Sequence, residues 1–273
     1  MARRTRQKGE RSALYERFSQ LYDTFMTDVD YESWADYLCR LYARGGKGLK
    51  PPGSPFERKK QKPLRLFDGA CGTGGVTIPL AVRGYAAAGG DLSGQMLAFA
   101  AEKARKQGVT VPFVRQDLRT LAVPRPVDVV NCSCDGVNYL LSAEEVRAFF
   151  RAAREALKPG GLLCFDVSSR WKLETILAGN IFGENAEKAA YLWRNAYDEE
   201  QRLLEMELTF FLSEDGKVFE RTQEIHVQRA HEQAELTKWL EECGFENIEV
   251  FGAFTFEAPK STDERLQFLA VRP

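Results

Sequence analysis

The stretch Leu64-Arg-Leu-Phe-Asp-Gly-Ala-Cys-Gly-Thr-Gly-Gly75 decides how the rest of this chain is interpreted. The apolar run before Asp68 is too short for a helix, and a glycine-rich turn follows it. A helix is expected over residues 76–82. Strand, glycine turn and helix together open an α/β nucleotide-binding unit, because glycines let the backbone approach a ligand and helix-start amides favour an anionic group.

The turn does not fit the dinucleotide fingerprint G-x-G-x-x-G, because Thr77 stands where the third glycine belongs. A NAD-dependent reductase is therefore disfavoured. Two further strands, predicted over 86–91 and 111–118, also lead into acids, Asp91 and Asp117. A carboxylate at the carboxyl end of a parallel strand loses hydration unless it meets a ligand or a donor, so three such acids indicate a binding site.

The composition excludes several classes of protein. With 44% hydrophobic and 28% charged residues, the 273-residue chain has the profile of a globular protein. Its net charge of −1 creates no general attraction to nucleic acid, and we expect no membrane span and no secretory signal. The six cysteines are scattered, and only two histidines occur, so we expect no metal site and a reduced, cytoplasmic protein.

The opening stretch resembles motif I of class I S-adenosylmethionine-dependent methyltransferases, with Ala70 where that motif often has glycine. Asp91-Leu-Ser-Gly-Gln-Met-Leu97 and Lys158-Pro-Gly-Gly161 are similar to later motifs of the same family. The resemblance implies a Rossmann-like α/β fold whose seven-stranded sheet is mostly parallel with an antiparallel last strand. It also implies S-adenosylmethionine as cofactor and S-adenosylhomocysteine as product.

The resemblance further assigns roles along the cofactor. The turn from Asp68 to Gly74 would hold the methionine end, Asp91 the ribose hydroxyls and Asp117 the adenine amino group. An N-terminal helix pair would lie across the site, with Tyr22 as the best candidate there. The full set of expected cofactor contacts is Tyr22, Asp68, Gly69, Ala70, Cys71, Gly72, Gly74, Asp91, Leu92, Met96, Gln116, Asp117, Leu118, Cys134 and Asp135.

The acceptor side is less sharply defined. The loop after a fourth strand should face the transferred methyl group and offers Asp135, Asn138 and Tyr139. A β-rich insertion follows, in which positions 218–229 alternate between a polar face with His226 and an apolar face. The polar face is either solvated or turned to the acceptor, which His226 or Arg229 could then reach. The catalytic candidates are His226, Asn138 and Tyr139, and a covalent cysteine mechanism is not expected.

We therefore expect an N-terminal segment of tail, helices and loop over 1–63, a methyltransferase core over 64–169 and 230–273, and an antiparallel β lid over 170–229. The expected function is methyl transfer to an O, N or C atom of a small molecule. An RNA or tRNA methyltransferase is the alternative, which the basic runs at 1–11 and 58–62 support and the near-neutral charge opposes. A non-catalytic S-adenosylmethionine-binding module is the third reading. The acceptor and the oligomeric state are left open.

Overall fold

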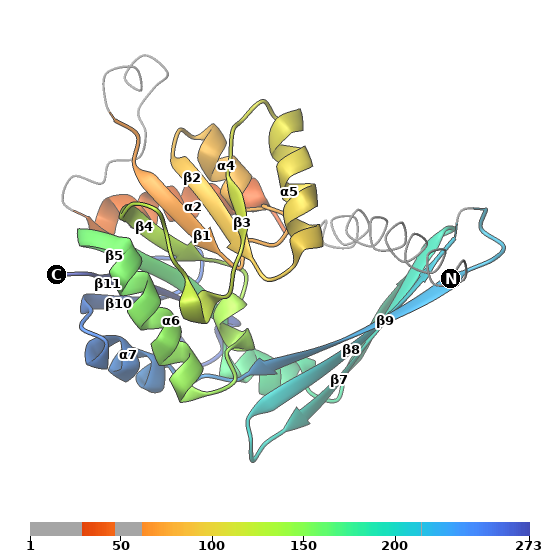
Figure 1. Cartoon of the computed structure of the whole chain (residues 1–273). Coiled ribbons are helices and arrows are strands. Elements are labelled where there is room, and N and C mark those ends of the chain that lie inside the picture. The colour runs from red at the N-terminus through yellow and green to blue at the C-terminus, as the bar shows by residue number, and fades with distance from the viewer. Residues whose placement is uncertain (1–28, 47–61, 214) are drawn as a thin grey trace, which may run out of the picture.

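A computed structural model describes residues 29–46, 62–213 and 215–273. Tyr22, the first expected helix and the basic tail lie outside the described residues. The architecture is a seven-stranded sheet with helices on both faces and a second, four-stranded sheet that projects from it (Figure 1). Within the described part, no helix is long and apolar enough to cross a membrane.

The large sheet has the strand order β10-β11-β5-β4-β1-β2-β3. Pairing is parallel from β3 to β5, and the last strand, β11, runs antiparallel to both of its neighbours. Its strands are β1 (Arg65–Gly69), β2 (Ala86–Asp91), β3 (Phe113–Arg115), β4 (Val127–Cys132), β5 (Leu157–Ser168), β10 (Glu246–Gly252) and β11 (Arg265–Val271). The expected fold class is confirmed.

Alternate residues of the central strands belong to two cores, one on each face of the sheet. Val129 and Leu162 pack on the side of α2, whereas Val130 and Leu163 pack on the side of α6 and α7. The helices and short helical turns are α2 (Tyr31–Gly45), α4 (Thr77–Val82), α5 (Gly94–Lys106), α6 (Ala143–Ala156), α7 (Gln233–Glu242), and η1 (Leu118–Thr120), η2 (Gly136–Tyr139) and η3 (Lys172–Leu177). Burial on both faces explains why the strands are continuous apolar runs.

The second sheet consists of β6 (Ile181–Asn185), β7 (Ala189–Asp198), β8 (Leu203–Leu212) and β9 (Glu220–Arg229), paired antiparallel in that order. We call it the insertion sheet, because it stands between β5 and α7 in the chain. In β9 the polar face is the covered one: Gln228 is 3% exposed, whereas Ile225 on the opposite face is 63% exposed. Of the two possibilities for the polar face, the burial of Gln228 favours a covered one.

Local details differ from the sequence expectations at three places. The third strand is shorter than 111–118, since Asp117 already caps η1. Strand β5 begins at Leu157 and includes the Lys158-Pro-Gly-Gly161 motif as a bulge against β4, although glycine and proline are typical of a turn. The spacing of Ser142 and Glu145 is that of a capping box, but only half of it forms: Ser142 Oγ accepts from the Glu145 amide, whereas the Glu145 carboxylate accepts from the Leu141 amide.

Candidate active site

The candidate site lies at the carboxyl ends of β1, β2 and β4, where the strand order of the sheet reverses. Open α/β sheets bind ligands at this switch point. The turn after β1 is left-handed at Ala70 (φ 53°), Gly72 (φ 53°) and Gly74 (φ 75°). A side chain at Gly72 would meet nothing within 4 Å, so the backbone of this turn is open to a ligand.

Asp68, at the end of β1, is 2% exposed and supports the turn from below. Its carboxylate accepts hydrogen bonds from Thr77 Oγ1 at 2.5 Å and from Asn131 Nδ2 at 2.7 Å. Burial raises the pKa of Asp68 to about 6, against the effect of these two donors. Asn131 in turn accepts from the Tyr42 hydroxyl at 2.9 Å, which ties α2 to the site. Sequence reasoning missed Asn131, which carries no motif signal.

Asp91, at the end of β2, closes the glycine turn from the other side. Its carboxylate accepts from the Gly72 amide at 2.9 Å and from the Ser93 amide at 2.8 Å. The next residues lie at the start of α5, where Leu92 is exposed and Met96 is half-buried with its amide bonded to Ser93 Oγ. The residues expected to hold the methionine and ribose parts of the cofactor are thus joined by direct hydrogen bonds.

Beyond β3, the expected adenine residues have different surroundings. Both oxygens of the Asp117 carboxylate are held by Arg119, at 3.0 Å from Nε and 2.5 Å from Nη2, and Arg119 also bonds Glu145. Leu118 packs against Gly69, where an added Cβ would lie 2.5 Å from Leu118 Cδ2. Arg119 is a further candidate functional residue here, because it sets the orientation of Asp117.

The buried side-chain amide of Gln116 bears on whether the site suits a nucleoside ligand. Its Oε1 accepts from the Ala122 amide, while its buried Nε2 finds no acceptor among the described residues. A buried amide group without a partner is costly, and the acceptor atoms of a nucleoside would relieve that cost. Together with the open turn at Gly72 and the acids Asp68 and Asp91, this orphan donor fits S-adenosylmethionine.

The loop after β4 combines two strained residues. Cys134 (φ 61°) and Asp135 (φ 56°) are both left-handed, and both of their amides donate to the Asp166 carboxylate, at 2.8 and 3.0 Å. Burial raises the pKa of Cys134, and of Cys71 in the turn after β1, so both remain thiols. A thiol is a weaker nucleophile than a thiolate. Asp166 had no sequence signal beyond its place at the end of an apolar strand.

Asp135 is held by two partners. Arg265 Nη1 donates to its Oδ1 at 2.7 Å, and Gln228 Nε2 donates to its Oδ2 at 2.8 Å. Burial by itself would raise the pKa of Asp135, but the Arg265 charge and the Gln228 amide hold that pKa below its ordinary value. Asp135 is therefore an anion at neutral pH, next to the loop that should face the methyl group.

Asn138, one of the three catalytic candidates, is engaged with the backbone. The side chain is fully buried, and its Nδ2 donates to the backbone oxygens of Ser168 and Arg229, while its Oδ1 accepts from the Ser168 amide. With its amide group used in this way, Asn138 cannot reach an acceptor. It instead joins the two ends of the segment that contains the insertion sheet.

Tyr139 and His226, the other two catalytic candidates, lie together. The Tyr139 hydroxyl is 3.3 Å from His226 Nδ1, and His226 Nε2 is 3.1 Å from the Glu224 carboxylate. A carboxylate that orients an imidazole, whose other nitrogen faces a reacting group, is the arrangement of a general base. Glu224 was not singled out from the sequence, although its place two residues before His226 on the same face of β9 could have identified it. Arg229 does not line this group, because its Nη1 donates to the Leu141 carbonyl.

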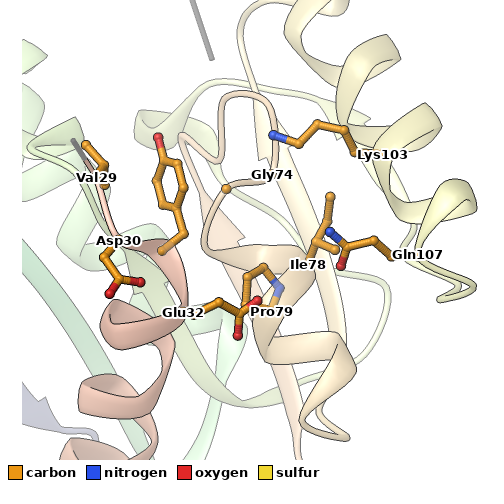
Figure 2. A pocket seen from close by; sticks show the side chains of 10 residues that line it. Val29, Asp30, Glu32, Gly74, Ile78, Pro79, Lys103 and Gln107 are labelled. Carbon is orange, nitrogen blue, oxygen red and sulfur yellow. The ribbon is translucent and has the colours of Figure 1, made fainter. Parts of the chain in front are cut away.

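A pocket of about 330 Å³ lies at Gly74 of the glycine turn (Figure 2). It is lined by residues at the start of α2, including Asp30 and Glu32, by Gly74 and the first turn of α4, and by Lys103 on α5. Neither the three strand-end acids nor His226 lines it. Among the residues that the structure describes, no cluster of histidine, cysteine or acid side chains could hold a metal ion.

Comparison with known proteins identifies the family. Residues 67–161 match the family model described as "Methyltransferase domain". A protein of Geobacillus sp. (strain WCH70), provisionally named a methyltransferase, is 38% identical over 94% of this chain and 99% of its own length. A crystal structure of an S-adenosylmethionine-dependent methyltransferase from Clostridium acetobutylicum ATCC 824 is 28% identical, with a TM-score of 0.80 over 94% of this chain and 98% of that one.

A more distant structure shares the fold alone. The sugar N-methyltransferase KedS8 from Streptoalloteichus sp. ATCC 53650 is 22% identical, with a TM-score of 0.69 over 92% of each chain. The match to the Geobacillus protein extends over almost the whole of both chains, so it includes the insertion sheet as well as the large sheet. The chain belongs to the class I S-adenosylmethionine-dependent methyltransferases and is an enzyme of that family.

Proposed function

We propose that this enzyme methylates an amine nitrogen of a small polar molecule that binds between η2 and the covered face of β9. The observation that carries the proposal is the contact chain of Tyr139, His226 and Glu224. It stands beside the loop at Cys134 and Asp135, which we propose to face the methyl group. KedS8, a sugar N-methyltransferase by its title, supports the kind of acceptor proposed.

The charges around this space favour a cationic acceptor. Glu224 and Asp135 are the acids on its two sides, and both carboxylates are partly exposed. Arg265 is shared between Asp135 and Asp166, so it neutralises only one of the two. An ammonium group is attracted to such a site, whereas the phosphates of an RNA acceptor are repelled.

The chemistry that follows is proton removal and alignment. When bound, S-adenosylmethionine supplies an electrophilic methyl group on a sulfonium sulfur. A protonated amine has no free electron pair, so it must first lose a proton. In this proposal the Tyr139 oxygen receives that proton while the Tyr139 hydroxyl passes its own to His226 Nδ1, and Glu224 stabilises the imidazolium that results. The Tyr139 hydroxyl then orients the free amine.

The test is transfer of a radiolabelled methyl group into separate pools of small molecules, RNA and protein. We expect label in a cationic small-molecule fraction, and label only in RNA would overturn the proposal. Cofactor binding with no transfer into any pool would instead indicate a binding module.

The base is tested with the variant His226→Gln in the same assay. Because the amide cannot take the proton, we expect kcat to fall about 100-fold or more at pH 7. The loss should shrink at high pH, where the free amine forms without a base. Gln223→Leu, on the opposite and exposed face of β9, is the matched control and should keep full activity. Equal rates for wild type and His226→Gln at pH 7 would contradict the role of His226.

A further inference from the structure

A buried charged cluster next to the active site takes no part in the proposed proton transfer. It consists of Arg265 at the start of β11 and the carboxylates of Asp135 and Asp166. Arg265 also lies over the Trp34 ring of α2, at 5.2 Å from the ring centroid. The guanidinium therefore joins α2, the last strand and the loop after β4. A buried arginine with two acids is retained at a cost in desolvation, which suggests a role in positioning.

The cluster dictates the conformation of the loop after β4. Asp166 is 0% exposed and receives the amides of the left-handed residues Cys134 and Asp135. A non-glycine residue stays left-handed only where its surroundings over-determine it. The next residue, Gly136, has no room for a side chain, because a Cβ there would lie 2.9 Å from the Ala70 Cβ of the glycine turn. The loop is thus locked against the turn that we propose to hold the cofactor.

The same cluster reaches the insertion sheet. Asp135 uses one oxygen for Arg265 and the other for Gln228 of β9, at 2.8 Å. Gln228 and His226 share the covered face of β9, two residues apart. Because Gln228 donates to Asp135, a shift of the Asp135 carboxylate would also shift Gln228 and the part of β9 that carries His226.

We infer that Arg265 and Gln228 are positioning residues that couple the cofactor side of the site to the acceptor side through Asp135. Arg265 fixes the Asp135 carboxylate, and Gln228 transmits its position to β9. Cofactor binding against the loop after β4 then restrains the base-bearing strand. This inference rests on the proposed placement of Cys134 and Asp135 at the cofactor.

Hydrogen exchange on the full chain, with S-adenosylhomocysteine as the probe ligand, tests the coupling without knowledge of the acceptor. In the wild type we expect the ligand to slow exchange of residues 222–229 several-fold. In Gln228→Leu the dissociation constant, measured by calorimetry, should stay within about twofold while the protection of 222–229 is lost. The control Gln223→Leu, on the exposed face of β9, should keep both the wild-type dissociation constant and the protection of residues 222–229. Simple destabilisation would speed exchange with and without ligand and leave the difference between them unchanged.

A second variant separates the two positioning residues. Arg265→Gln should weaken S-adenosylhomocysteine binding about tenfold and also abolish the protection, because it releases the loop itself. A Gln228→Leu/Arg265→Gln double variant should bind no more weakly than Arg265→Gln alone. Protection that persists in Gln228→Leu, or its absence from a wild type that binds the ligand, would overturn the coupling. A wild type that does not bind S-adenosylhomocysteine would count instead against the cofactor site.

Discussion

Asp91 has two proposed tasks, and one substitution removes both. Its carboxylate holds the Gly72 amide of the turn and is proposed to accept the ribose hydroxyls. Asp91→Ala removes both interactions, so we expect the S-adenosylmethionine dissociation constant to rise 10- to 100-fold in calorimetry, about 1.4 to 2.8 kcal/mol. Glu102→Ala, which removes an exposed acid of α5, is the control and should bind normally. An unchanged affinity in Asp91→Ala would show that the ribose assignment is wrong.

The raised pKa of Asp68 leads us to expect that cofactor binding depends on pH. Because its pKa is raised to about 6, the carboxyl is mostly neutral at pH 5 and mostly ionised at pH 7. We propose that Asp68 faces the methionine end of the cofactor, where its ionised form would attract the ammonium group of S-adenosylhomocysteine, so affinity should be up to about tenfold higher at pH 7 than at pH 5. In Asp68→Asn we expect this step to vanish. Calorimetry at pH 5 and pH 7 measures the two dissociation constants. An equally large difference between them in Asp68→Asn would assign the titration to another group.

At the scale of elements, Asn138 is one of the residues that attach the insertion sheet to the rest of the molecule. Asn138 bonds Ser168 at the end of β5 and Arg229 at the end of β9, so it closes the base of the inserted segment. Asn138→Ala leaves three buried backbone groups without that partner, and we expect a loss of about 3 kcal/mol in the free energy of unfolding. Urea unfolding measures this loss. Asn185→Ala, at an exposed site in β6, should change stability by less than about 0.5 kcal/mol.

At the scale of the whole molecule, His231 makes stability depend on pH. The ring is 1% exposed, and burial lowers its pKa to about 4, next to Trp239. Below its ordinary pKa of about 6.5 the unfolded chain binds a proton that the folded protein refuses, so stability falls from pH 6.5 down to pH 4. Between pH 8 and pH 5 the lowered pKa of His231 reduces the free energy of unfolding by about 2 kcal/mol.

His231→Phe should abolish that part of the loss. Thermal or urea unfolding at pH 8 and pH 5 should show a smaller difference in the variant than in the wild type. The buried acid Asp68 acts with the opposite sign, because its raised pKa favours the folded state as pH falls from 6 toward 4. The His231 effect is therefore obtained by subtracting variant from wild type, and an identical pH difference in both proteins would contradict it.

Much of the fold could be predicted from local patterns. Strands buried on both faces produce short apolar runs, and the carboxyl ends of neighbouring parallel strands meet at one edge, so the sequence alone was enough to group Asp68 with Asp91. Asn131, Asp166 and Arg265 could not be predicted in this way. Their partners stand tens of residues away in the chain, and nothing near them in the sequence signals those contacts.

By itself, the sequence determined the α/β class, the glycine turn opened by Asp68, and the alternation of β9 that puts Glu224 and His226 on one face. Only the tertiary structure decided which face of β9 is covered, that Asn138 donates to the Arg229 carbonyl at the end of β9, and that the Tyr139 hydroxyl contacts His226. The physical reason is that alternation and turn chemistry are properties of neighbouring residues. The covered face depends on how the insertion sheet docks on η2, and contacts between distant segments settle that.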